Sequence, residues 1–175
     1  TAIAATYLNI PLVHLQGGEV SGNIDDRVRH AITKLADLHF VCSQESAERV
    51  MSMGEMPKTI FNYGCPSMDV LSYNDLSISN EIMERYQGVG QPLDWTKPYL
   101  LMLQHPVTTS YGKGFDEVSE SLHALTMVSD IQKVVMWPNI DAGSDQVSKG
   151  IRVFRENSSG EPISYFKNFS PEDYA

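Results

Sequence analysis

The stretch "HLQGGEVSGNIDDRVRHAITK", His14 to Lys34, decides how the first part of the chain folds. It leaves a short apolar run, turns through Gly17 and Gly18, and enters a segment whose apolar residues recur at helical spacing. Asp25 and Asp26 fall in the first turn of that segment, where carboxylates complement the helix dipole. The stretch predicts a strand, a glycine turn and a helix. Its charged residues either complement the helix dipole or belong to an active site.

The same alternation continues along the chain. Apolar, strand-like runs occur at residues 11–16, 39–43, 58–64, 99–104, 133–138 and 163–165. Helical spacing occurs at residues 24–38, 45–53, 115–128 and 143–155. Strands that alternate with helices predict βαβ units and parallel sheets. Residues 66–97 are less regular, with helical patterns at 69–71 and 80–86, so they separate two doubly wound halves.

Four polar or glycine-rich segments follow the predicted strands. They are "QGGE" at 16–19, "GCPS" at 64–67, "QHPVTT" at 104–109 and "PNIDAGS" at 138–144. In doubly wound folds the segments at the carboxyl ends of the strands form the ligand cleft. The pattern therefore predicts a cleft lined by these four segments.

The bulk composition excludes several classes of protein. A hydrophobic content of 42% and a charged content of 20% are ordinary for a soluble globular protein, and the net charge of −9 argues against nucleic-acid binding. The longest apolar run, 99–103, is far shorter than the roughly 18 residues of a membrane span. Cys42 and Cys65 lack the spacing of a zinc site or a disulfide framework, which favours reduced thiols in a cytoplasmic protein. Neither a metal constellation nor a dinucleotide fingerprint is present in the sequence.

The motifs resemble those of the UDP-N-acetylglucosamine 2-epimerase family, and the hydrolysing branch most closely. The stretches that carry the resemblance are "HLQGGEVSGNIDDRVRHAITKLADLHFV", "GCPSMDVL", "LQHPVTT" and "PNIDAGS", in matching order and spacing. The resemblance implies two Rossmann-like α/β domains, as in GT-B glycosyltransferases, with the nucleotide sugar between them. It also implies a homo-oligomer and no cofactor. We expect residues 1–88 to be the second half of the first domain, 89–98 a linker, and 99–175 the first half of the second, so that both domains are incomplete and the 175-residue piece alone is inactive.

The reaction of the hydrolysing branch, as the resemblance implies it, removes the proton at C2 of the sugar while UDP leaves C1. Water then adds to the resulting glycal. This chemistry needs two proton-transfer groups on opposite ring faces. The family places a catalytic acid at Asp25, whereas Asp26 reads as a capping or supporting group, because neighbouring helical residues point roughly 100° apart. Gln16 stands where the family carries a glutamate and can only form hydrogen bonds. Glu19 is either its substitute or a surface carboxylate.

The remaining candidates surround these groups. His105 matches the family's catalytic histidine, either for proton transfer or for a hydrogen bond to the departing phosphate. His30 is expected to pair with the acidic group and orient it, whereas His14, in mid-strand, reads as a core histidine. The predicted substrate-binding residues are Gly17, Gly18, Arg29, His30, Thr108, Asn139, Asp141 and Ser144. Ser144 either binds phosphate at a helix start or only caps the helix.

The leading hypothesis is a hydrolysing UDP-N-acetylglucosamine 2-epimerase of sialic-acid-type synthesis. The alternatives are a hydrolysing epimerase of a UDP-2,4-diacetamido-trideoxyhexose, a non-hydrolysing epimerase, and a nucleotide-sugar-binding module without turnover. Gln16 is the feature that supports the last alternative.

Overall fold

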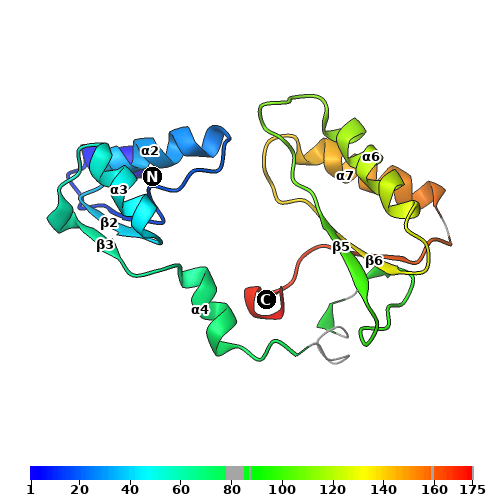
Figure 1. Cartoon of the computed structure of the whole chain (residues 1–175). Helices are drawn as coiled ribbons and strands as arrows, with labels where there is room; N and C mark the ends of the chain where they lie inside the picture. The colour runs from blue at the N-terminus through cyan, green and yellow to red at the C-terminus, as the bar shows by residue number, and fades with distance from the viewer. Residues whose placement is uncertain (78–84, 87, 159, 175) are drawn as a thin grey trace. The chain divides into compact units, whose positions relative to one another are not determined.

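The computed structural model describes residues 1–77, 85–86, 88–158 and 160–174, and it divides into two compact units. Unit 1 is Thr1–Tyr73 and unit 2 is Asn74–Ala175. Each unit is described by itself below, and Figure 1 labels the helices and strands of both.

Unit 1 is a three-stranded parallel sheet with helices. Its strands are β1 (Val13–Leu15), β2 (Leu38–Val41) and β3 (Ile60–Asn62), in the order β1-β2-β3. Its helices are α1 (Ala2–Tyr7), α2 (Ile24–Leu35), α3 (Gln44–Ser52), the 3₁₀ turn η1 (Pro57–Thr59) and α4 (Pro66–Tyr73). The side chains of Asn23 and Ser43 cap α2 and α3 by accepting backbone N–H groups, which fixes where each helix begins.

The core of unit 1 lies between α3 and the sheet. Val41, Ala47 and Val50 are buried there against Ile60. The opposite face carries the exposed side chains of Val13 and Leu15. His14 faces the core side, where its Nδ1 lies 3.2 Å from the hydroxyl of Thr33, as predicted for a core histidine.

Unit 2 is a four-stranded sheet with the order β4-β7-β6-β5. The strands are β4 (Val89–Gly90), β5 (Tyr99–Leu103), β6 (Gln132–Met136) and β7 (Ile163–Phe166). All pairs are parallel except β4 with β7. The helices are α6 (Gly114–Thr126), α7 (Ser144–Asn157) and α8 (Pro171–Tyr174). Figure 1 shows α6 and α7 side by side.

The main core of unit 2 joins α6 and α7 to the sheet. Val118, Leu122, Val147 and Ile151 are buried against Val135 and its neighbours. Gly150 allows the close approach of the helices, because a Cβ there would lie 2.3 Å from the Val118 side chain. A second cluster, around Val134, Met136 and Phe166, covers the other face.

The predicted α/β class with two Rossmann-like units is confirmed, and every predicted strand is present. The helix predicted at 24–38 ends at Leu35, because Leu38 already pairs with Val13 in the sheet. The prediction for 69–71 was too short, since α4 fills Pro66–Tyr73. The helical pattern at 80–86 lies largely outside the described residues. The limits 1–88, 89–98 and 99–175 stay predictions, and β4 lies within the expected linker.

Within the described part of the chain, no helix combines the length and the apolar character needed to cross a bilayer.

Candidate functional site

The strand ends of unit 1 bring Gln16, Cys42 and Cys65 to one edge of the sheet. β1, β2 and β3 run parallel, so the residues that follow them lie at the same edge. Gln16 has a φ of 60°, in the left-handed region. Its backbone N–H donates to the Phe40 carbonyl at 2.8 Å, and its side-chain Nε2 donates to the Cys65 sulfur at 3.5 Å. The amide of Gln16 is therefore held by β2 and by the segment after β3.

Gly17 and Gly18 pack the turn against the neighbouring helices. A Cβ on Gly18, whose φ is 81°, would lie 2.4 Å from the Ser46 carbonyl oxygen. A Cβ on Gly17 would lie 2.9 Å from His14 Nδ1. Both glycines are buried, so close packing alone requires them. Their substrate-binding role stays a prediction.

Asp26 and Arg29 tie the loop after β1 to the start of α2. Asp26 accepts hydrogen bonds from the backbone N–H groups of Ser21 at 2.8 Å and Gly22 at 2.9 Å. Arg29 donates to Asp26 and to the Glu19 carbonyl, both at 2.9 Å. These bonds, that of the Ser21 backbone above all, hold the pKa of Asp26 at about 2. Asp26 thus holds the loop in place, which is what a supporting group would do.

Asp25 differs from its neighbour. Its backbone N–H donates to the Asn23 cap at 2.8 Å, and the residue is exposed. Within the described residues, its carboxylate makes neither a hydrogen bond nor an ion pair. The expected pairing of His30 with an acid is likewise not formed there: His30 Nδ1 is buried without a partner among the described residues, and Arg29 takes the contact with Asp26. The carboxylate of Asp25 is therefore available to a ligand.

Glu19 turns toward the sheet edge. It is half-buried, and its carboxylate lies close enough to the Cys42 thiol, at the end of β2, to contribute to the pKa shift of that thiol. Burial first, and then the neighbouring Glu19 and Cys65, raise the pKa of Cys42 to about 11. This position favours the inward reading of Glu19 over that of a surface carboxylate.

The strand ends of unit 2 bring His105 and Asn139 together. His105 follows β5 and is exposed, and its Nδ1 accepts the backbone N–H of Asn139 at 3.2 Å. This bond leaves the proton of the neutral ring on Nε2, as a donor. The Asn139 side chain accepts from the Asp141 backbone at 3.4 Å, and the Asp141 carbonyl accepts from Ser144 at 3.0 Å.

The start of α7 corrects one prediction. Gly143, with a φ of 94°, is the N-cap of α7, and Ser144 is its first helical residue, so the capping interpretation of Ser144 is wrong. The exposed Thr108 lines a small crevice together with Gly143, so the loops after β5 and β6 meet.

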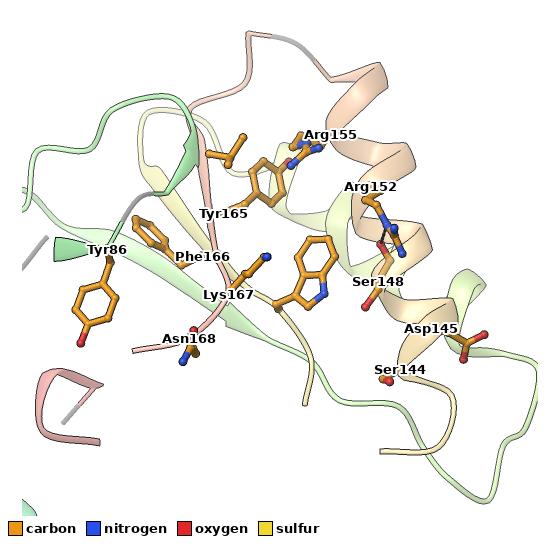
Figure 2. Close-up of a pocket in the computed structure, with 12 residues that line it drawn as sticks. Tyr86, Ser144, Asp145, Ser148, Arg152, Arg155, Tyr165, Phe166, Lys167 and Asn168 are labelled. Atoms are coloured by element: carbon orange, nitrogen blue, oxygen red, sulfur yellow. Dashed lines mark hydrogen bonds between the residues drawn. The ribbon is translucent and has the colours of Figure 1, made fainter. Parts of the chain in front are cut away.

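Unit 2 also contains a basic pocket that the sequence patterns did not predict. It has a volume of about 790 Å³. Figure 2 shows its labelled side chains, among them Ser144, Arg152, Arg155, Tyr165 and Lys167. The Arg152 guanidinium lies 5.9 Å from the centre of the Trp137 ring, a cation–π contact. Three cations and one carboxylate, Asp145, suit an anionic ligand with an aromatic part. The three-residue spacing of the two arginines on a helix was the available signal.

The fold and the polar strand ends define a class of protein: a two-unit, Rossmann-like α/β fold of the GT-B type. Comparison with known proteins gives the family. A family model described as UDP-N-acetylglucosamine 2-epimerase matches residues 1–175. The chain therefore belongs to the UDP-N-acetylglucosamine 2-epimerase family, a family of enzymes.

Three similar proteins illustrate the match. A UDP-N,N'-diacetylbacillosamine 2-epimerase (hydrolyzing) from Legionella pneumophila is 35% identical over 153 residues, which is 87% of this chain and 39% of that protein. Polysialic acid biosynthesis protein P7 from Escherichia coli is 30% identical over 99% of this chain and 42% of its own length. The crystal structure of UDP-GlcNAc 2-epimerase from Neisseria meningitidis bound to UDP-GlcNAc superposes with a TM-score of 0.72 at 16% identity, over 99% of this chain and 47% of that one. The chain spans about two fifths of the length of the curated relatives.

Proposed function

We propose that the full-length protein is a hydrolysing UDP-N-acetylglucosamine 2-epimerase, which converts its substrate and water into N-acetylmannosamine and UDP. Membership of the family and the 35% identity to a relative described as hydrolysing support this reaction. The structural observation that carries it is the contrast within the loop after β1. There Asp26 and Arg29 fix the backbone, while the Asp25 carboxylate is exposed.

The reaction proceeds in two stages. In the first, a base takes the proton from C2 of the sugar, a C1–C2 double bond forms, and the C1–oxygen bond breaks as its electron pair leaves with UDP. In the second, water adds its oxygen to C1 and a proton returns to C2 from the opposite face. We assign proton transfer at C2 to Asp25. Glu19 is the second acid, because Gln16 cannot accept a proton and serves only as a donor.

His105 acts on the leaving group. Because its Nδ1 accepts the Asn139 backbone N–H, its Nε2–H is the free donor. We assign this donor to the phosphate oxygen that gains charge as the C1–oxygen bond breaks. The basic pocket holds the diphosphate through Arg152, Arg155 and Lys167, which balance its negative charge.

Mixing the full-length protein with UDP-N-acetylglucosamine tests the proposal. We expect equal amounts of free UDP and N-acetylmannosamine, with deuterium at C2 when the reaction runs in deuterated water. Formation of the epimeric UDP-sugar without free UDP would contradict hydrolysis.

A matched pair of variants tests the role of Asp25. Asp25→Asn removes the proton-transfer group, so we expect kcat to fall by about 10² to 10⁴-fold. Asp69→Asn, at an exposed carboxylate in the first turn of α4, should leave kcat unchanged. Equal rates for both variants would remove Asp25 from the mechanism.

The second candidate substrate is a UDP-2,4-diacetamido-trideoxyhexose. It is favoured by the relative from Legionella pneumophila, whose name gives UDP-N,N'-diacetylbacillosamine. The ratio of kcat/KM for the two UDP-sugars, measured on one preparation, decides between them. A ratio above one for UDP-N-acetylglucosamine supports the first candidate.

A further inference from the structure

Cys42 and Cys65 meet at the edge of the sheet in unit 1. They lie far apart in the chain, but β2 and β3 are parallel neighbours in which Val41 pairs with Asn62. Each cysteine follows the end of its strand at the same edge of the sheet, and each thiol contributes to the pKa shift of the other. Both thiols are free and only partly buried. The fold thus forms a thiol pair that the sequence spacing does not indicate.

Three kinds of donor surround the sulfur of Cys65. Cys65 directly precedes the eight-residue helix α4, so the backbone N–H groups of Ser67 and Met68 lie near its sulfur, and the Met68 N–H donates to the Cys65 carbonyl at 2.9 Å. The Gln16 side chain donates to it at 3.5 Å, and the Cys42 thiol faces it. These donors, the Ser67 backbone first, lower the pKa of Cys65 below its ordinary value of 9.0. Cys65 is therefore the thiol of the pair that loses its proton more readily.

The pKa of Cys42 shifts in the opposite direction. Its burial and its position beside the Glu19 carboxylate and Cys65 raise its pKa to about 11, so it remains a protonated thiol. One thiol that ionises and is partly exposed, beside a second that keeps its proton, is the arrangement of an attacking and a resolving cysteine.

We propose that Cys65 and Cys42 form a peroxide-sensitive modification site that closes reversibly to a disulfide. The Cys65 thiolate attacks a hydroperoxide, the O–O bond breaks, and one oxygen stays on sulfur as a sulfenic acid. The other leaves as alkoxide or hydroxide and takes a proton from solvent. The sulfur of Cys42 then attacks the sulfenic sulfur. Its own proton and the departing hydroxyl form water, so that two thiols lose two electrons and the peroxide gains them.

The modification lies beyond the epimerase reaction, which transfers no electrons. It changes the surroundings of two candidate site residues, since Gln16 donates to the Cys65 sulfur and Glu19 faces the Cys42 thiol. Closing the disulfide removes the negative charge beside Gln16 and the S–H beside Glu19. Oxidation is thus expected to lower turnover, and reduction by a dithiol to restore it.

Peptide mapping of the wild-type, full-length protein tests the proposal without using turnover. After treatment with hydrogen peroxide, non-reducing tryptic digestion should yield peptide 35–49 joined to peptide 59–85, and dithiothreitol should separate them. If both cysteines are recovered as separate thiols or as sulfinic acids, the proposal fails. Because the map reports only sulfur chemistry, this result leaves the proposed epimerase activity untouched.

Two variants test the assigned roles. In Cys42→Ser, a sulfenic acid should accumulate at Cys65 and be trapped by dimedone. In Cys65→Ser, the remaining thiol should react with peroxide about tenfold more slowly. The pKa of Cys42 is raised and that of Cys65 is lowered, so Cys65 carries more thiolate, and the lower nucleophilicity of a more acidic thiol offsets only part of this advantage. Equal rates, or a faster Cys42, would overturn the assignment.

Discussion

The loop after β1 and the loop after β6 both carry candidate site residues, but they are held in place by different contacts. In unit 1, residues 16–29 are fixed by an arginine, a carboxylate and two buried glycines. In unit 2, residues 138–144 are held by hydrogen bonds from the backbone N–H groups of Asn139, Asp141 and Ser144, and Ile140 is fully exposed. A loop fixed by several bonds holds catalytic groups in place before the ligand arrives. The looser loop is suited to adjust to the ligand that it binds.

The largest expected effect is a loss of turnover without a loss of stability, and it concerns a residue of unit 2. His105→Ala in the full-length protein should lower kcat by about 10² to 10⁴-fold, because the donor that we assign to the leaving group is lost. Its stability should hardly change, since His105 is exposed and accepts one hydrogen bond at 3.2 Å. His123→Ala, at an exposed histidine on α6, is the control and should retain full activity. A parallel loss of melting temperature and rate in His105→Ala would contradict this division.

Gly18 tests how tightly the loop of unit 1 is fixed. Gly18→Ala should lower the free energy of unfolding by about 3 kcal/mol, because its positive φ is combined with a Cβ position 2.4 Å from the Ser46 oxygen. Gly22→Ala is the matched control: its φ is 79°, nothing lies within 4 Å of its Cβ position, and about 1 kcal/mol is expected. Urea denaturation measures both, and equal losses would show that the packing of Gly18 on α3 contributes nothing.

Arg29 links the same loop to α2. Arg29→Ala should lower kcat/KM by about tenfold through loss of loop position and reduce the melting temperature by about 3 °C. Arg27→Ala, at an exposed residue of the same helix, should change neither. If Arg29→Ala leaves kcat/KM at the wild-type value, its bonds to Glu19 and Asp26 do not position the site.

The smallest effect depends on pH. The carboxyl of Asp26 has a folded-state pKa of about 2, below its ordinary 3.8, so it stabilises the fold above pH 3.8 and loses this contribution as the pH falls toward 2. Asp26→Asn should therefore lower the melting temperature at pH 7, and the difference from wild type should shrink at pH 3. Asp69→Asn serves as the comparison. A difference that grows on acidification would contradict the assigned sign.

Much of the fold could be predicted because it depends on local patterns. Helical spacing from Ile24 and the apolar runs of the strands identified the elements, and their alternation identified the parallel sheets. The residues at which the helices and strands end were harder to predict. The apolar pattern that begins at Ile24 runs through Leu38, yet Leu38 belongs to a strand, since pairing with Val13 outweighs helical spacing.

The candidate site could be predicted only where its residues lie within a single segment of the sequence. The separate roles of Asp25 and Asp26 depend on the cap at Asn23, and the inward position of Glu19 depends on the end of β2. The contact of Cys42 with Cys65 requires the register of β2 and β3, and the contact of Arg152 with Trp137 requires the rotation of α7. The spacing of these residues along the chain does not predict any of these contacts.

Gln16 has a consequence at the level of the gene. Glutamine and glutamate codons differ by one base, and their side chains have nearly the same shape, so Gln16→Glu is a single mutational step that keeps the size of the side chain. The two residues nevertheless suit different neighbours: an amide donates to the Cys65 sulfur, whereas a carboxylate would repel a thiolate there. Residue 16 and residue 65 should therefore evolve as a linked pair.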